Sequence, residues 1–360
     1  MTTRLMIVGG FLGAGKTTLL LKSAHLLTER GYRVGLVPND QGKDLVDTLL
    51  LSQQSFPVTE VSGSCFCCAF PDLLQALHHL QNMVQPDIIL AEPVGSCTDL
   101  VATVLRPLAE YYPGHFEVAP LTVLVDATRE VDLFSNNVSY LFDRQLAESE
   151  LILLNKTDLV ESSQLAQTQS AFQSKYSQAR LLSISAHTGT GIDQWLDIVL
   201  GQTSSSPFNM TVDYERYAEA EAELAWLNAK GIVRSSVPFS ARNWTSKLLD
   251  SLEQSLTRSP IAHIKTHVKT TQANFKASLT RHGHPPSWDV DSEDVPTEQL
   301  EFVLNARVST DPNILQQVVL QSIDAIKPDT LARHYLTHFE CFRPLPPRPT
   351  HRLAALTHQD

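Results

Sequence analysis

The sequence predicts a three-layer α/β domain with a mainly parallel sheet, followed by a smaller α+β domain. Three observations support this prediction. Short apolar runs alternate with segments of helical spacing over the first 200 residues. A glycine-rich loop stands between the first apolar run and the first helical segment. Beyond a stretch rich in Ser, Thr and Gly, the order of the elements changes.

The predicted strands of the first domain are nearly continuous apolar runs, which are typical of a parallel sheet covered by helices on both faces. The first run, residues 4–8, ends in glycines, and residues 16–28 after it have helical spacing. Further apolar runs cover residues 32–38, 57–61, 86–90, 121–125, 151–154 and 180–185. Helical patterns are also expected over residues 72–83 and 191–200.

Three boundaries divide the chain. We predict a first domain over residues 1–203, a linker over 204–218 and an α+β domain over 219–342. The second domain is expected in the order β-α-β-β-β-α, at residues 223–233, 244–257, 261–269, 274–280, 301–309 and 312–326. The tail, residues 343–360, holds four prolines, and we expect it to be loosely attached.

Composition and charge exclude several classes of protein. Of the 360 residues, 42% are hydrophobic and 19% charged, which is typical of globular domains and not of disordered chains. No apolar run reaches the ~18 residues of a membrane-spanning helix, and no signal-peptide pattern begins the sequence, so we expect a cytoplasmic protein with no membrane partner. The net charge of −11 argues against binding nucleic acid through a basic surface.

The glycine-rich loop fits the pattern G-x-x-x-x-G-K-[ST] from Gly10 to Thr17, after a predicted strand and before a predicted helix. Its backbone N–H groups and the helix N-terminus suit phosphate, Lys16 would reach the β- and γ-phosphates, and the Thr17 hydroxyl would bind Mg²⁺. The motif predicts the P-loop NTPase fold. The expected phosphate-binding residues are Gly10, Gly13, Ala14, Gly15, Lys16, Thr17 and Thr18.

A second motif selects the base. Asn155, Lys156 and Asp158 form N-K-x-D at the end of a predicted strand. The Asp158 carboxylate would accept from N1–H and the exocyclic amine of guanine, a pair that adenine does not offer. Ser185 and Ala186 follow the next strand, where a backbone N–H would meet the guanine oxygen. Together with the P-loop, these residues favour GTP over ATP.

A third motif is Glu92-x-x-Gly95, after the apolar run 86–90. Its carboxylate would hold the Mg²⁺ shell, and the Gly95 N–H would meet the γ-phosphate. We therefore expect Lys16, Thr17 and Glu92 to serve catalysis. Asp126, also at a strand end, is either a further site residue or a simple strand terminator. No catalytic base or arginine finger is evident, so slow GTP hydrolysis is expected.

Three of the five cysteines are crowded into one loop. Cys65, Cys67 and Cys68 lie between a predicted strand and a predicted helix, whose N-terminus would lower the pKa of their thiols. Three soft donors in four residues suit a thiophilic divalent ion of the Zn²⁺ or Co²⁺ class. Buried unreactive cysteines and a redox role are the alternatives.

The ordered set of motifs resembles the CobW-type GTPases, a metallochaperone family related to urease and hydrogenase maturation factors. The resemblance covers the first 160 residues, including the segment from Asn39 to Gly42 with Asp47. It implies that the Asn39 loop is a switch and that Asp40 binds metal with the cysteines. Three departures are Ser64 before the first cysteine, Asp40 in place of the usual glutamate, and the missing histidine-rich tract.

The resemblance also implies partners. These are GTP, a divalent metal, and a client metalloprotein or cobalamin-type pathway enzyme recognised by the second domain; a homodimer stays open. A P-loop small-molecule kinase and a non-enzymatic GTP-dependent metal-responsive adaptor are the alternative functions. A secondary metal site is considered at His334, His338 and Cys341, which would share one face if residues 329–342 are helical. Two histidine pairs, His282 with His284 and His263 with His267, are weaker candidates.

Overall fold

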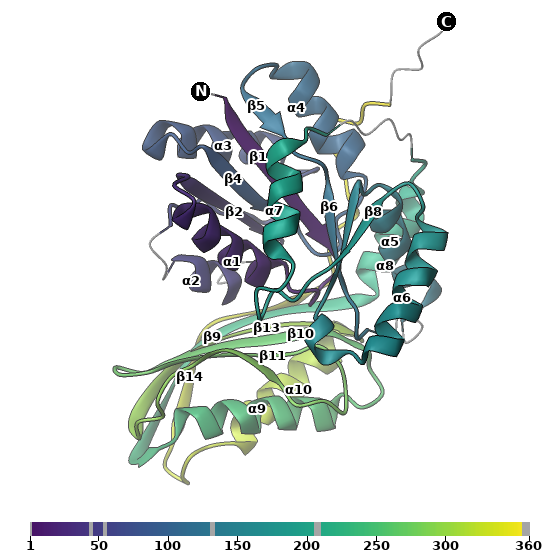
Figure 1. The fold of residues 1–360 in the computed structure, drawn as a ribbon. Coiled ribbons are helices and arrows are strands. Elements are labelled where there is room, and N and C mark those ends of the chain that lie inside the picture. Colours follow the sequence, from purple (N-terminus) through teal and green to yellow (C-terminus); the bar gives the residue numbers. More distant parts are fainter. Residues whose placement is uncertain (1, 43–45, 53–55, 130–133, 205–209, 355–360) are drawn as a thin grey trace, which may run out of the picture. The chain divides into compact units, whose positions relative to one another are not determined.

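The computed structural model describes residues 2–42, 46–52, 56–129, 134–204 and 210–354 (Figure 1). The chain divides into two compact units. The first comprises residues 1–41, 50–217 and 347–360, and the second comprises residues 42–49 and 218–346. Each unit is described separately. None of the helices in the described ranges is long and apolar enough to cross a membrane.

The first unit is built on a parallel sheet of eight strands in the order β3-β2-β4-β1-β6-β7-β8, with β5 pairing with β1. The strands are β1 (Thr3–Gly10), β2 (Val34–Asp40), β3 (Val61–Ser62), β4 (Ile88–Glu92), β5 (Phe116–Val118), β6 (Thr122–Asp126), β7 (Leu151–Asn155) and β8 (Arg180–Ser183). The chain builds one side of β1 and then the other, so the strand order reverses at β1. Ligands of open α/β sheets bind at the carboxyl ends of strands around such a point.

Helices cover both faces of this sheet, as its apolar strands predict (Figure 1). On one face, α1 and α7 pack against β1, β4 and β6, with Trp195 fully buried. The helices of the first unit are α1 (Lys16–Glu29), α3 (Phe70–Val84), η1 (Val101–Leu105), α4 (Arg106–Tyr111), α5 (Asn136–Ala147), η3 (Thr157–Leu159), α6 (Ser162–Lys175) and α7 (Ile192–Gly201). Two further helices, α2 (Val46–Ser52) and α8 (Tyr214–Ala222), each include residues of both units. The predicted three-layer α/β class is confirmed. The apolar run 57–61 forms only β3 and an isolated bridge at Val58.

The second unit is an antiparallel sheet in the order β12-β11-β10-β13-β9-β14, with two helices packed on it. Its elements are β9 (Leu224–Phe239), α9 (Ala241–Ser255), β10 (Ile261–Lys269), β11 (Asn274–Leu279), β12 (Ser287–Asp291), β13 (Thr297–Ser309), α10 (Pro312–Ala325) and β14 (Arg333–Phe342). Trp244 on α9 packs against Phe302 on β13, with ring centroids 5.3 Å apart. The predicted α+β class of this part is confirmed.

Residues 329–342 do not form the helix that the secondary metal site would require. Residues 333–342 form β14, which pairs with β9 along the edge of the sheet. From Arg333 to Thr337 exposure alternates residue by residue, a period of two that belongs to a strand. His334, His338 and Cys341 therefore do not share a helix face, and Cys341 donates to the Pro312 carbonyl oxygen. The described residues hold no metal-ligating group at this place.

The predicted linker and the predicted tail are each described in part. The predicted linker 204–218 contains residues 205–209, which lie outside the described residues, and the start of α8. The tail is not loosely attached over its described part, because Thr350 and Leu353 make backbone hydrogen bonds to the first unit. Proline content indicates an extended chain, and it says nothing about what that chain pairs with.

Candidate nucleotide and metal site

The P-loop joins β1 to α1, which begins at Lys16. Gly15 has φ 96°, and a Cβ built on it would lie 2.5 Å from Asn155 Nδ2. Glycine is needed there both for the left-handed backbone and for the close approach. The Lys16 ammonium donates to the Gly10 carbonyl oxygen at 2.9 Å.

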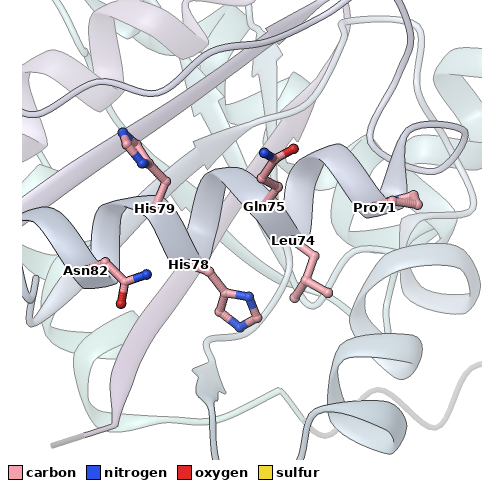
Figure 2. A pocket seen from close by; sticks show the side chains of 6 residues that line it. All are labelled: Pro71, Leu74, Gln75, His78, His79 and Asn82. Carbon is pink, nitrogen blue, oxygen red and sulfur yellow. The ribbon is translucent and has the colours of Figure 1, made fainter.

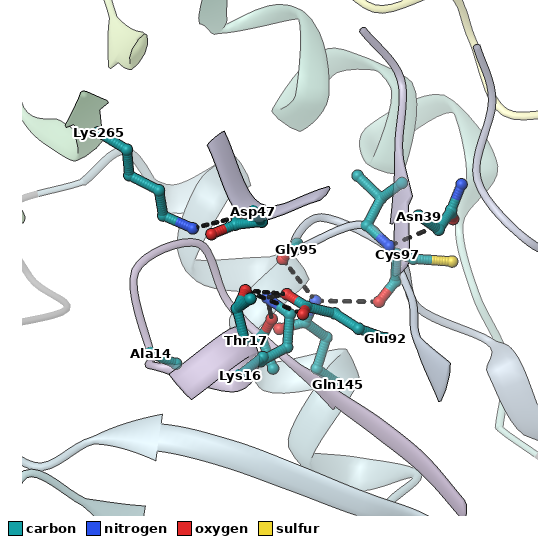
Figure 3. A network of polar contacts seen from close by, with 12 residues as sticks. Ala14, Lys16, Thr17, Asn39, Asp47, Glu92, Gly95, Cys97, Gln145 and Lys265 are labelled. Atoms are coloured by element: carbon teal, nitrogen blue, oxygen red, sulfur yellow. Dashed lines mark hydrogen bonds and ion pairs between the residues drawn. The ribbon is translucent and has the colours of Figure 1, made fainter. Parts of the chain in front are cut away.

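Glu92, at the end of β4, meets the P-loop residues directly (Figure 3). The Thr17 hydroxyl donates to Glu92 Oε2 at 2.9 Å, and Lys16 Nζ lies 3.8 Å from Glu92 Oε1. All three side chains are buried. A hydroxyl and a carboxylate oxygen beside a phosphate loop are the hard donors that Mg²⁺ prefers, so these residues fit the ion.

Asn155 organises the predicted base pocket. Its Nδ2 donates to the Ala14 carbonyl oxygen at 2.8 Å, and its Oδ1 accepts from the Ala186 N–H at 2.8 Å. The Ala186 N–H is therefore used within the protein. Ser185 Oγ accepts from the Thr188 N–H, which shapes the same loop. The side chain of Asp158 is exposed, as a residue that reads a ligand must be.

Asp126 forms an ion pair with Lys156. The Lys156 ammonium lies 2.7 Å from Asp126 Oδ2, on the neighbouring strand end. Burial opposes ionisation of Asp126, but the charges of Lys156 and Arg129 outweigh it and hold the pKa of this carboxyl below its ordinary value. The observed contact of Asp126 is with the lysine of the N-K-x-D motif, and neither of the two roles considered for Asp126 is tested by it.

The cysteine loop brings three sulfurs together. Backbone hydrogen bonds from the N–H groups of Cys68 and Ala69 to the Cys65 carbonyl oxygen form a tight turn before α3. The sulfur of Cys65 lies 2.8 Å from that of Cys67 and 3.4 Å from that of Cys68, and the last two are 3.7 Å apart. Among the described residues, these are the one group of three or more metal-ligating side chains close enough to share an ion.

Contacts between sulfurs, together with burial, raise the pKa of two of these thiols, Cys67 and Cys68. Hydrogen bonds with Cys65, Cys68 and Cys97, together with burial, raise the pKa of Cys67 well above its ordinary value. The contact with Cys65 is the main cause that raises the pKa of Cys68 to about 11. This differs from the expectation that the helix N-terminus lowers the pKa, because crowding and burial outweigh it. A divalent cation would reverse the balance by stabilising the thiolates.

Asn39 ties three segments together. Its Oδ1 accepts from the N–H of Phe66 at 3.0 Å and from that of Val94 at 3.4 Å. Its Nδ2 donates to the carbonyl oxygens of Val61 at 2.8 Å and Ser64 at 2.7 Å. One buried side chain at the end of β2 therefore joins the cysteine loop to the loop after Glu92.

Gln145 on α5 holds the loop after β4. Its Nε2 donates to the carbonyl oxygens of Gly95 at 3.0 Å and Cys97 at 2.9 Å (Figure 3). The Cys97 sulfur lies 3.8 Å from that of Cys67. Cys97 was not predicted at the site from the sequence. Its position two residues after Gly95, in a loop at the same sheet edge, was the signal available.

The C-terminal segment reaches the cysteine loop within the first unit. The Arg348 N–H donates to the Cys68 sulfur at 3.1 Å, and the Thr350 N–H donates to the Cys67 carbonyl oxygen at 2.9 Å. Arg352 pairs with Asp99 at 2.8 Å. These contacts were not predicted from the sequence.

Two acidic residues of the expected switch differ in their surroundings. Asp40 ends β2, and its carboxylate is not among the three grouped metal ligands, so its role as a ligand stays a prediction. Asp47 belongs to the second unit, where it pairs with Lys265 and Lys276. In the same segment, the Val46 N–H donates to Asn305 Oδ1 at 2.8 Å. Val46 and Asp47 are thus held by residues of the second sheet.

A separate pocket lies along α3 (Figure 2). Burial and the neighbouring His115 lower the pKa of His78, one of its residues. None of the predicted site residues lines it. The lining residues are Pro71, Leu74, Gln75, His78, His79 and Asn82.

Comparison with known proteins gives one matching family model, described as CobW/HypB/UreG, nucleotide-binding domain, over residues 4–182. The Escherichia coli zinc chaperone YjiA is 28% identical over 162 residues, which cover 42% of this chain and 49% of that protein. Zinc chaperone YeiR of the same organism is 31% identical over 159 residues, 43% of this chain and 47% of that protein. The chain thus spans about half the length of these curated relatives.

Solved structures are similar at low identity. Zn(II)-bound YjiA GTPase from E. coli aligns with 91% of this chain and 99% of its own, at 15% identity and a TM-score of 0.39. HypB from Helicobacter pylori in complex with nickel aligns with 57% of this chain and 92% of its own, at 15% identity and a TM-score of 0.43.

Proposed function

This chain belongs to the CobW/HypB/UreG family through its nucleotide-binding domain, and we propose that it is a GTP-hydrolysing metallochaperone. It would bind a thiophilic divalent ion of the Zn²⁺ or Co²⁺ class at Cys65, Cys67 and Cys68 and deliver it to a client protein or cofactor pathway. The observation that carries this proposal is the Asn39 side chain, which bonds both to the cysteine loop and to the loop after Glu92. Through Asn39, a movement of the proposed nucleotide contacts would also displace the proposed metal ligands.

The nucleotide would sit on the P-loop with its base at Asp158. Phosphate oxygens would accept from the backbone N–H groups of residues 13–18 and from Lys16, whose ammonium now bonds to Gly10. Thr17 and Glu92 would hold Mg²⁺, which supplies charge neutralisation at the phosphates. The Gly95 N–H would meet the γ-phosphate. All of these site assignments are proposals supported by the contacts described.

Hydrolysis should be slow. Water must attack the γ-phosphate in line, and its rate depends on positioned charges and on a group that orients the water. Thr17 already donates to the Glu92 carboxylate, and the motif residues include no arginine. A client or metal that completes the site would accelerate the reaction.

The relatives support the metal assignment. Two of them are named zinc chaperones, and a Dictyostelium discoideum relative, 24% identical over 219 residues, is named a zinc-regulated GTPase metalloprotein activator. For this chain, zinc, the client and a role of the second unit in recognising that client are proposals. The anchoring of Asp47 on the second sheet supports a path from the switch to that unit.

Nucleotide preference and metal binding test the proposal together. GTP and ATP affinities of the full chain are measured first, then Zn²⁺ affinity with wild-type protein, Cys67→Ser/Cys68→Ser and the control Cys341→Ser. We expect GTP binding without ATP binding, and loss of Zn²⁺ binding in the double variant alone. Tight ATP binding without GTP binding would favour the small-molecule kinase. No phosphate release even with metal and client would favour the non-enzymatic adaptor.

A further inference from the structure

Cys97 is a buried thiol that the three-cysteine site does not account for. It lies in the loop after β4, two residues beyond Gly95, and only 1% of its surface is exposed. Its sulfur is 3.8 Å from that of Cys67, on a segment 30 residues away in sequence. It adjoins the group formed by Cys65, Cys67 and Cys68 without being a member of it.

Three of the sulfur separations match a four-thiolate zinc site, whereas Cys65 and Cys67, 2.8 Å apart, would have to separate by about 1 Å. Cys97 does not lie within 4.8 Å of all three other sulfurs, so it would have to move closer as the ion binds. Four sulfurs at about 2.3 Å around a tetrahedral Zn²⁺ lie about 3.8 Å from one another. The separations of Cys68 from Cys65 and Cys67, 3.4 and 3.7 Å, and of Cys97 from Cys67, 3.8 Å, are close to this value. The cysteine loop supplies three corners of such a tetrahedron, and a soft donor for the fourth stands beside it.

We propose that Cys97 is a fourth thiolate ligand of the metal, supplied by the loop that would contact the γ-phosphate. The proposal rests on the proposed function, because it concerns the same ion at the cysteine loop. Each of the four thiols loses its proton to solvent as its sulfur binds, so the donor set carries four negative charges. Four sulfurs close the coordination sphere, whereas three leave a position open to water or an incoming ligand.

The contacts of Cys97 make its position depend on Gly95, which precedes it in the loop after β4. Gln145 donates hydrogen bonds to the carbonyl oxygens of both Gly95 and Cys97. A displacement of Gly95 would therefore also displace Cys97. Packing also couples this loop to the P-loop, because a Cβ on Gly95 would lie 3.0 Å from the Leu12 backbone nitrogen. A change at the γ-phosphate would then move Cys97 toward or away from the ion. The same residue thus offers a means of holding and releasing the metal.

Cobalt provides the probe, because thiolate-to-Co²⁺ charge-transfer absorption grows with the number of bound sulfurs. Reduced, metal-free full-length protein is titrated with Co²⁺ under anaerobic conditions. Wild type is compared with Cys97→Ser, Cys97→Ala, Cys67→Ser and the control Cys341→Ser, whose cysteine lies on β14. We expect Cys97→Ser and Cys97→Ala to weaken the charge-transfer band by about a quarter and to lower affinity at least about tenfold, the smallest loss typical when even a supporting residue of a metal site is removed. Cys341→Ser should match wild type.

A second measurement does not depend on the folding of a variant. X-ray absorption of wild-type protein loaded with Zn²⁺ should give four sulfur neighbours at about 2.3 Å. Three sulfurs with one oxygen or nitrogen would overturn the assignment of Cys97. Unchanged Co²⁺ spectra and affinity in Cys97→Ser, with binding lost in Cys67→Ser, would also overturn it while the proposed function stands. Absence of thiolate binding in wild type would overturn both.

Discussion

Asn39 Oδ1 accepts a hydrogen bond from the backbone N–H of Phe66 at 3.0 Å, which fixes the cysteine loop to the end of β2. The Asn39 side chain is buried, with 7% of its surface exposed, so its bonds are made away from water. A buried donor or acceptor that loses its partner costs about 1–3 kcal/mol. This side chain is therefore expected to stabilise the loop and to transmit movement through it.

The first prediction concerns that connection. Asn39→Ala should lower the free energy of unfolding by about 1–3 kcal/mol, because the buried Val61 carbonyl oxygen and Phe66 N–H lose the hydrogen bonds that Asn39 makes to them. It should also reduce the difference in metal affinity between nucleotide states. Urea denaturation and metal titration check the two effects, with the exposed Asn82→Ala as control. If Asn39→Ala keeps the full difference in metal affinity between nucleotide states, Asn39 does not connect the two sites.

Asp158→Ala tests the base assignment. Hydrogen bonds to a charged acceptor contribute roughly 1.5–3 kcal/mol each, so GTP affinity should fall at least about tenfold. The fold should be unaffected, since the side chain is exposed. Inosine triphosphate, which lacks the exocyclic amine, sharpens the measurement: wild type should prefer GTP to it, and the variant should bind both equally. Unchanged GTP affinity would remove the guanine assignment.

The buried carboxyl of Glu148 predicts a pH dependence of stability. Burial raises the pKa of this carboxyl to about 8, although the Val101 N–H and the Thr98 hydroxyl donate to it. The folded protein therefore keeps a proton that the unfolded chain releases near the ordinary value of 4.5. The contribution of the Glu148 carboxyl to the free energy of unfolding is therefore complete below pH 4.5 and is lost as the pH rises toward about 8.

Glu148→Gln copies the protonated form, because its amide can donate to Thr98 while its oxygen accepts from Val101. Its free energy of unfolding should fall less than that of wild type between pH 5 and 8, a range set by that raised pKa. Chemical denaturation across this range checks it, with exposed Glu110→Gln as the matched control. If the free energy of unfolding changes with pH equally in wild type and in Glu148→Gln, the Glu148 carboxyl is not the source of the pH dependence.

The C-terminal segment should shield Cys68. The double variant Thr350→Ala/Arg352→Ala removes the hydroxyl bond to the Cys68 carbonyl oxygen and the ion pair with Asp99. We expect faster modification of Cys68 by a thiol reagent, because the Arg348 N–H that bonds its sulfur is no longer held in place. Arg343→Ala, which removes an ion pair with Asp311 away from the cysteine loop, is the control. Equal modification rates would contradict a shielding role.

Much of the fold followed from local patterns, and the remainder did not. The phosphate loop and the N-K-x-D motif are recognised from residues close together in sequence and from their place after predicted strands. These local patterns were enough to predict where Lys16 and Asp158 lie. The spacing of His334, His338 and Cys341 fits a helix, but edge pairing with β9 made this segment a strand. The approach of Cys97 to Cys67 is set by strand order, because β4 places its loop beside β2 and the cysteine loop. No short pattern carries that information.

We propose that nucleotide binding and metal binding affect each other, because the two proposed sites share one sheet edge. The most direct test is a competition titration of Zn²⁺ and Co²⁺ with full-length protein in nucleotide-free, GDP-bound and non-hydrolysable-GTP-bound forms. Metal affinity should differ between the GDP and GTP forms by a factor of roughly 5–150, and metal should change the affinity for the nucleotide by the same factor. Identical metal affinities in all three forms would contradict the metallochaperone mechanism, even if the metal binds tightly.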